Sequence, residues 1–179
     1  LAITREIADG WMGFSPPPLP SESDDETRFE WAVQLVNGTV LAPGESPNAP
    51  RVVDAVGPWQ AGAYHITWET APQNLPAIPG GAEWLVRSKA ERPAGERHLA
   101  VHSGHCTHLN DADRLAFQAW QASGGEIPWH GWVGEAEEIR KRAEQSAAAG
   151  STELLYTPAG DDLIGQAETF YEAVKPVQG

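Results

Sequence analysis

Residues 134–162, GEAEEIRKRAEQSAAAGSTELLYTPAGDD, contain the clearest structural pattern in the chain. The first half predicts a helix, because apolar residues recur at helical spacing, acids occupy the first turn and Gly150 follows as a stop signal. The run TELLYT then predicts a strand, and Asp161 or Asp162 can cap a following helix. Helix, strand and helix at this spacing are typical of a β/α repeat, so the stretch predicts a parallel sheet. The apolar helical positions are Ala136, Ile139, Ala143 and Ala147.

Similar signals extend toward the beginning of the chain. Residues 1–10, LAITREIADG, predict a helix that ends at Asp-Gly but has no capping residue at its start. The apolar run at 10–14, GWMGF, predicts a strand, and the β-branched residues within 29–45 predict another. Residues 50–63 have helical spacing, and we expect Pro58 to kink or divide that helix.

The remaining segments predict a mixture of short helices and loops. A brief helix is expected around Trp84, and residues 97–113 resemble a short strand that opens into a polar loop. Asn110 or Asp111 is expected to cap a helix that runs through Trp120. The predicted buried residues of the last helix are Leu163, Ile164, Ala167, Phe170, Tyr171 and Val174.

Composition limits the classes of partner and compartment. With 179 residues, of which 41% are hydrophobic, residues 1–179 are expected to form a single domain. Twelve basic and 25 acidic residues give a formal charge of −13, which disfavours nucleic acid and anionic membrane surfaces as partners. Cys106 is the sole cysteine and cannot form an internal disulfide. We therefore expect a cytoplasmic protein that does not enter a membrane.

Two stretches carry a resemblance to a known family. REIADGWMG at residues 5–13 and the 134–162 segment look like the luciferase-like flavin-dependent oxidoreductases, and NGTVLAPGESPNAPRV, PGGAEW and RHLAVHSGH are similar to one branch of them. The resemblance implies an α/β fold, namely the C-terminal half of a (β/α)8 barrel with about strands six to eight. Since a complete barrel takes about 250 residues, it also implies that the chain is N-terminally truncated.

The resemblance implies a chemistry and a set of site residues. The intact enzyme would act on a small organic substrate, either as a monooxygenase with FMN or by hydride transfer with the deazaflavin coenzyme F-420. Sites in such barrels lie at the carboxyl ends of the strands, and no catalytic residue is assigned. The implied cofactor-binding residues are Trp11, Met12, Gly13, Thr157 and Gly160, and the implied substrate-binding residues are Asn37, His102 and His105. For Trp11 the alternative is a place in the barrel core.

The histidines of residues 102–108 indicate a second possible kind of site, a metal site. His102, His105 and His108 form an H-x2-H-x2-H run, and imidazole is a common zinc ligand. On a strand, however, spacing by three alternates between faces, and no acidic residue lies between these histidines. We therefore expect no metal, and either a pocket role for His102 or His105 or solvated or hydrogen-bonded loop histidines. A histidine loop that binds a metal stays open as a weaker alternative. His65 and His130 are expected to be structural.

One alternative of a different class stays open. The chain could be a half-length protein that binds a flavin or a partner subunit without catalysing a reaction. It would then complete its barrel by association, either with the missing N-terminal half-barrel or with a second copy of itself. No G-x-G-x-x-G, Walker or G-x-S-x-G motif occurs, so the sequence favours neither a nucleotide-binding loop nor a nucleophile elbow.

Overall fold

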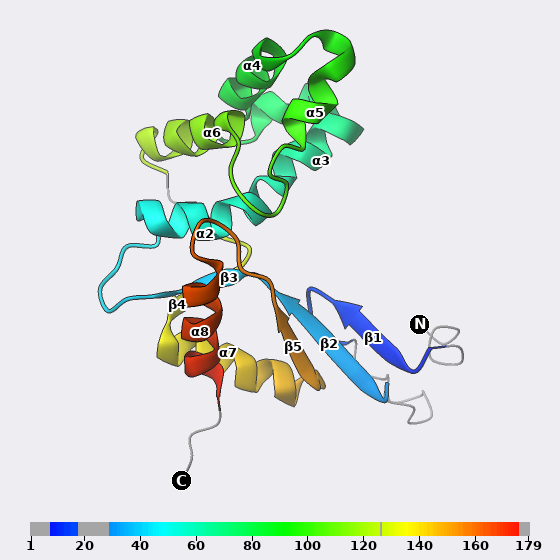
Figure 1. The fold of residues 1–179 in the computed structure, drawn as a ribbon, viewed down its shortest axis with the longest axis vertical. Coiled ribbons are helices and arrows are strands. Elements are labelled where there is room, and N and C mark those ends of the chain that lie inside the picture. Colours follow the sequence, from blue (N-terminus) through cyan, green and yellow to red (C-terminus); the bar gives the residue numbers. More distant parts are fainter. Residues whose placement is uncertain (1–7, 18–28, 126, 176–179) are drawn as a thin grey trace.

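The computed structural model describes residues 8–17, 29–125 and 127–175, which form an α/β structure (Figure 1). The strands are β1 (Gly10–Gly13), β2 (Trp31–Val36), β3 (Gly38–Leu41), β4 (Trp132–Glu135) and β5 (Glu153–Tyr156). The helices are α2 (Pro50–Gln60), α3 (Gly62–Thr70), α4 (Gly81–Glu91), α5 (Arg97–Val101), α6 (Asp111–Ala122), α7 (Ala136–Ala148) and α8 (Leu163–Val174), with 3-10 turns η1 (Pro72–Ala77) and η2 (Ala94–Glu96). Residues 1–7 of the expected opening helix lie outside the described residues.

The three strands β1, β2 and β5 form a parallel sheet with β2 in the centre. Gly13 of β1 and Leu154 of β5 both pair with Gln34 of β2, which fixes the register across the sheet. The long connection from β2 to β5 ends with helix α7, and a parallel pair of strands requires a crossover connection of this kind. The parallel sheet predicted from the 134–162 pattern is confirmed.

One face of this sheet packs on α7 and α8. The buried Gln34 accepts a hydrogen bond from Ser146 of α7 through its side-chain oxygen. Tyr156 stacks on Phe170 of α8, with ring centroids 4.1 Å apart and nearly parallel planes. Val36, Ile139 and Ala173 complete the apolar cluster between the sheet and these two helices.

The opposite face of the sheet is mostly apolar and partly open among the described residues; it also carries Val33, which is 8% exposed, and the exposed Glu153. Side chains alternate along a strand, so the neighbours of the helix-covered positions point the other way. Met12, Leu35 and Leu155 lie on this second face, and Met12 and Leu155 are 54% and 45% exposed. Trp31 lies across Gly10 on the same side, where a Cβ on Gly10 would overlap its ring. We call Met12, Trp31, Leu35 and Leu155 the open face.

Gly38 lets one continuous segment serve two sheets. Before it, β2 pairs with β1 and β5, and after it β3 pairs with β4 in a separate parallel pair. Gly38 has φ = 142°, and a Cβ there would lie 2.1 Å from the carbonyl oxygen of Trp132. Only glycine fits this conformation and this close approach. The strand therefore changes partners at Asn37 and Gly38.

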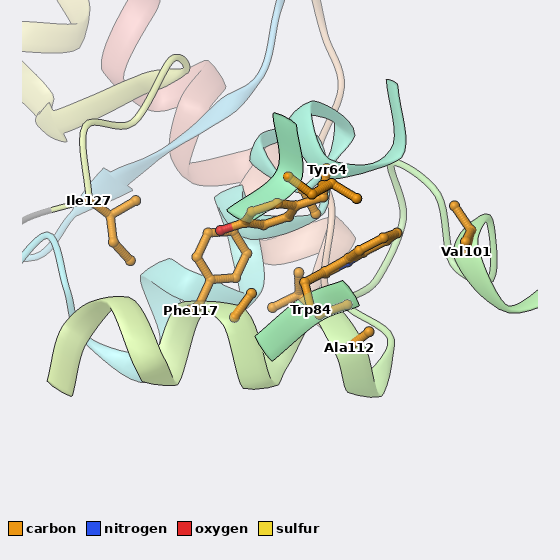
Figure 2. Packing of buried hydrophobic residues seen from close by; sticks show 10 residues of the cluster. Tyr64, Trp84, Val101, Ala112, Phe117 and Ile127 are labelled. Atoms are coloured by element: carbon orange, nitrogen blue, oxygen red, sulfur yellow. The ribbon is translucent and has the colours of Figure 1, made fainter. Parts of the chain in front are cut away.

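Helices α3 to α6 gather at one end of the molecule, and α2 lies between them and the sheet (Figure 1). Their core is aromatic, and Figure 2 shows the rings of Tyr64, Trp84 and Phe117 packed together. Tyr64 and Trp84 stack with ring centroids 5.9 Å apart, and the Tyr64 hydroxyl donates to the carbonyl oxygen of Pro79. Asn110 caps α6 in a capping box with Asp113, as the sequence predicted for this helix.

The structure corrects two local predictions. Residues 97–101 form the short helix α5 and not a strand. Ala100 and Val101 are buried, Val101 packs into the core of the helical part, and hydrogen-bonded turns follow from Ala100 onward. In α8, Ile164 and Tyr171 were expected to be buried but are 75% and 63% exposed, since only the side carrying Phe170 and Ala173 meets the sheet.

The remaining helices lie close to their predicted ranges, but Ala167 of α8 was also expected to be buried and is exposed. Pro58 lies inside α2, and the division predicted near it comes three residues later, at Ala61. Leu163 at the start of α8 was expected to be buried and is 47% exposed. No helix among the described residues is both long enough and apolar enough to cross a lipid bilayer.

Replacing Gly38 by Ala tests the partner change. The substitution Gly38→Ala should lower the free energy of unfolding by at least about 2 kcal/mol, from backbone strain and from the clash with Trp132. Urea denaturation followed by circular dichroism measures the loss. Gly62→Ala is the matched control, because a Cβ at Gly62 has no neighbour within 4 Å. Equal midpoints for the two variants would contradict the role given to Gly38.

Candidate functional site

The carboxyl ends of β1, β2 and β5 meet at one edge of the sheet, on the side of α2 (Figure 1). This edge brings together several of the implied cofactor and substrate residues. Gly13 ends β1, Asn37 follows β2, and Thr157 follows β5, where its backbone N–H donates to the carbonyl oxygen of Val36. The Thr157 hydroxyl also lies 3.2 Å from that oxygen.

Trp11 and Met12 point to opposite faces of the sheet. Trp11 shares the face of Gln34, is half-buried, and has its ring centroid 6.1 Å from that of Phe29. Its indole nitrogen is buried and has no hydrogen-bond partner among the described residues. Met12 belongs to the open face. Of the two side chains, therefore, Met12 is the one that a molecule lying against the open face would contact.

Gly160 joins the segment after β5 to the helices. Its backbone N–H donates to the carbonyl oxygen of Thr107 at 2.7 Å. A Cβ on Gly160, whose φ is 84°, would lie 2.7 Å from the carbonyl oxygen of Asp54. Pro58 has no N–H to offer that oxygen within α2, so the carbonyl is free of its usual helical partner. The segment 157–162 is thus held between α2 and the loop that carries the histidines.

Asn37 lies at the partner change of the central strand. Its carbonyl oxygen accepts a hydrogen bond from the backbone N–H of Trp132 at 2.8 Å. A Cβ on Gly131 would lie 2.6 Å from the Asn37 side-chain oxygen, so this glycine leaves room for the amide. Asn37 is half-buried at the carboxyl edge, and its backbone joins the two sheets.

A groove lies beside the carboxyl end of β3 and the start of α8. It has a volume of about 460 Å³ and is open to solvent. Arg51 lines it and donates to Thr39 Oγ1, to the Val40 carbonyl oxygen and to the carboxylate of Glu45. The hydrogen bond from Arg51 lowers the pKa of Glu45 to about 2. The guanidinium charge is therefore already paired. The groove lining is Thr39, Val40, Leu41, Ala42, Pro43, Arg51, Ala136, Asp162, Gly165, Gln166 and Thr169.

His102 and His105 do not lie on the sheet edge; they lie in the helical part, directly after α5. There they meet His65 of α3, a histidine that the sequence placed as structural. The three ring centroids form a triangle with sides of 5.0, 5.6 and 5.7 Å, and one ring nitrogen from each lies within 4.8 Å of the others. We call His65, His102 and His105 the histidine cluster.

The third histidine of the H-x2-H-x2-H run, His108, is outside the cluster. It is exposed, and its Nδ1 lies 3.1 Å from the hydroxyl of Thr107. The sequence run therefore contributes two members of the cluster, and the third comes from a helix 37 residues earlier. Spacing within the run could not indicate His65, because the contact depends on how α3 packs beside α5.

Asp113 of α6 stands behind the histidine cluster. Its carboxylate and the His65 ring are each about 1% exposed. Oδ1 accepts from the indole N–H of Trp84 at 2.8 Å and lies 3.1 Å from His65 Nε2, while Oδ2 accepts from the backbone N–H of Asn110. Because the carboxylate only accepts, His65 carries its proton on Nε2 and presents the Nδ1 lone pair to His105.

The surroundings of His105 favour its neutral imidazole. Burial lowers the pKa of His105, and the neighbouring His65 and His102 lower it further, against a weaker opposing effect of Asp113. His105 is therefore uncharged at neutral pH, with one ring nitrogen free to accept or to ligate. His102 is 42% exposed, and its Nε2 lies 3.1 Å from the carboxylate of Glu69.

Comparison with family models, with curated proteins and with solved structures gave no match to this chain.

Removing the buried carboxylate tests its structural role. Asp113→Ala leaves the Trp84 indole N–H and the His65 N–H without a buried acceptor, so the free energy of unfolding should fall by about 2–5 kcal/mol. Asp111→Ala is the control two residues earlier, since that side chain is 71% exposed in its ion pair with Arg87 and should cost less than about 1 kcal/mol. Chemical denaturation of both variants gives the comparison, and similar losses would refute the role of Asp113.

Proposed function

We propose that this chain forms the sixth to eighth β/α units of a luciferase-like (β/α)8 barrel, a flavin- or deazaflavin-dependent oxidoreductase acting on a small organic substrate. The order of the parallel sheet carries the proposal. In such a barrel consecutive strands are neighbours, and β1, β2 and β5 follow each other both along the chain and across the sheet. Strands β3 and β4 and helices α2 to α6 then form an insertion inside the seventh unit, between its strand β2 and its helix α7.

The two faces of the sheet support the barrel. A (β/α)8 barrel has helices outside and packed apolar side chains inside. Helices α7 and α8 cover one face, and the open face offers Met12, Leu35 and Leu155, apolar side chains of the kind that fill a barrel interior, beside one charged residue, Glu153. Within the described residues, β1 and β5 each have one strand partner, so both outer edges offer unpaired backbone groups for neighbouring strands.

The carboxyl edge offers side chains that suit a flavin ring. A flat tricyclic ring system needs apolar contact surface and a few neutral hydrogen-bonding groups. Met12 supplies apolar surface, Asn37 and Thr157 supply an amide and a hydroxyl, and Gly13 at the end of β1 adds no side chain. None of these four groups is charged. When bound, the cofactor supplies hydride transfer or oxygen activation, and these residues would orient its ring against the substrate.

The insertion supports a role in covering the site. The segment 157–162 contacts both α2 and the loop at Thr107, so the helices are fastened next to the carboxyl edge. Phe14, just after β1, packs edge-on against Trp59 of α2 with ring centroids 5.9 Å apart. This contact places α2 beside the end of β1, although Phe14 itself is 63% exposed.

A second candidate is a non-catalytic protein that binds a flavin or a partner subunit and completes its sheet with another copy of this chain. The open face favours it as well, because two apolar sheet faces can cover each other. The two candidates differ in what covers the face and in whether a reduced cofactor reacts.

Charge placed on the open face tests whether that face is an interface. For the 179-residue chain we expect self-association and binding of a hydrophobic dye, and Leu155→Glu should reduce both. Leu163→Glu is a matched control on α8, because Leu163 is 47% exposed and Leu155 is 45% exposed. Light scattering coupled to size exclusion gives the mass. A monodisperse wild-type monomer that binds no dye would argue against both candidates.

Cofactor titration distinguishes the enzyme from other functions. The product of the whole open reading frame that contains this chain should bind FMN or coenzyme F-420, measured by fluorescence. Thr157→Ala should weaken binding by about 3–10-fold, the equivalent of one lost hydrogen bond. Thr70→Ala, at the exposed end of α3, should leave the affinity unchanged. Absence of binding to either cofactor would refute the proposed oxidoreductase.

A further inference from the structure

The histidine cluster has the dimensions of a metal site. Zinc–nitrogen bonds of about 2.0–2.1 Å in tetrahedral geometry place the centres of two ligating imidazole rings about 5 Å apart. The observed separations in the cluster are 5.0, 5.6 and 5.7 Å. Three rings from two separate segments thus form a triangle of the size that one ion requires.

Two ring nitrogens of the cluster lie close enough to share one ion. His65 Nδ1 and His105 Nδ1 lie 2.8 Å apart, and the His65 nitrogen presents a lone pair because its Nε2–H faces Asp113. Two such nitrogens are held together either by one shared proton or by an ion between them. Tetrahedral zinc needs a nitrogen–nitrogen separation of about 3.3 Å, so the rings would have to part by only about half an ångström.

We propose that His65, His102 and His105 bind a divalent zinc-like ion through their imidazoles, with a fourth position open to solvent. An all-imidazole donor set suits zinc, copper or nickel and is poorly matched to calcium or magnesium, which prefer oxygen ligands. The proposal is independent of the flavin function.

Asp113 supplies the carboxylate that hydrogen-bonds a ligating histidine in many metal sites. Metal-bound histidines generally donate their second N–H to a carboxylate or a carbonyl, which fixes the tautomer and the ring orientation. Asp113 does this for His65 and is itself held by Trp84 and by the backbone of Asn110. Among the described residues, His65 is its ion-pair partner. An ion on His65 Nδ1 would place positive charge near this buried carboxylate and lower the cost of its burial.

The exposed side of the cluster gives access to an ion. The His65 ring is buried, whereas His102 and His105 are exposed and lie on the solvent side of the cluster. Glu69 Oε1 lies 3.1 Å from His102 Nε2 and is 52% exposed, so a carboxylate also stands at the entrance. It can orient His102 or approach the ion as a further ligand.

The backbone around His102 and His105 is shaped by two left-handed residues. Gly104 has φ = 74°, and a Cβ there would lie 2.4 Å from the carbonyl oxygen of His108. Cys106 has φ = 60°, a left-handed conformation that is unfavourable for a residue with a side chain. This tight turn puts His102 and His105 on the same side, toward α3. Its last part, Thr107, is the residue that accepts the N–H of Gly160.

Metal titration of the whole 179-residue chain tests the proposal. The metal-free chain is titrated with Zn²⁺ against a chromogenic chelator and with Co²⁺, whose visible absorption becomes intense in a tetrahedral site. We expect one ion per chain. His102→Ala and His105→Ala, both at exposed positions, should each weaken zinc binding by at least about 100-fold, and Asp113→Asn by about 10–100-fold.

Two controls separate the cluster from ordinary surface histidines. His108→Ala and His98→Ala remove exposed imidazoles from the same region outside the cluster and should leave affinity and cobalt spectrum unchanged. Far-ultraviolet circular dichroism confirms that each variant is folded. The proposal is overturned if the folded wild-type chain binds no zinc at 100 equivalents, or if His105→Ala and His108→Ala bind it equally. In either case the His65–His105 pair shares a proton and is structural.

Discussion

The partner change at Gly38 determines where the parts of this molecule lie. Because the chain turns there with a positive φ against the backbone of Trp132, β2 remains the centre of the parallel sheet while β3 leaves it to pair with β4. Everything from α2 to α6 is inserted between these two short strands. The helices are thereby held beyond the carboxyl ends of the sheet, the position at which parallel α/β structures form their sites.

Among the helices, the buried carboxylate of Asp113 holds several segments together. Charge in an apolar interior is costly unless it is hydrogen-bonded, and the Asp113 carboxylate has three partners, from three places in the chain. Tyr64 and His65 are neighbours on α3, yet one faces the aromatic core and the other faces Asp113. The aromatic core and the histidine cluster are therefore connected through Asp113, which accepts from Trp84 of the core and lies 3.1 Å from His65 of the cluster.

Local signals predicted much of the fold, and contacts distant in sequence limited the rest. The helix, strand and cap pattern of residues 134–162 and the cap at Asn110 depend on neighbouring residues, and those predictions are confirmed. The burial of α8 was overestimated at Ile164 and Tyr171, because an apolar stripe does not state how much of it a neighbour covers. The meeting of His65 with His102 and His105 depends on helix packing, and no spacing in the sequence encodes it.

The amino-acid composition of a strand indicates whether one or both faces of its sheet are covered. Parallel strands that are covered on both faces have nearly continuous apolar sequences, whereas strands with one wet face alternate with polar residues. β2, WAVQLV, has one polar residue in six, and that residue, Gln34, faces the helices and is satisfied by Ser146 and Phe14. Its other face carries Val33 and Leu35 and continues into Met12 and Leu155. The sequence of the central strand is therefore that of a sheet with a layer on each side, and α7 and α8 form one of those layers.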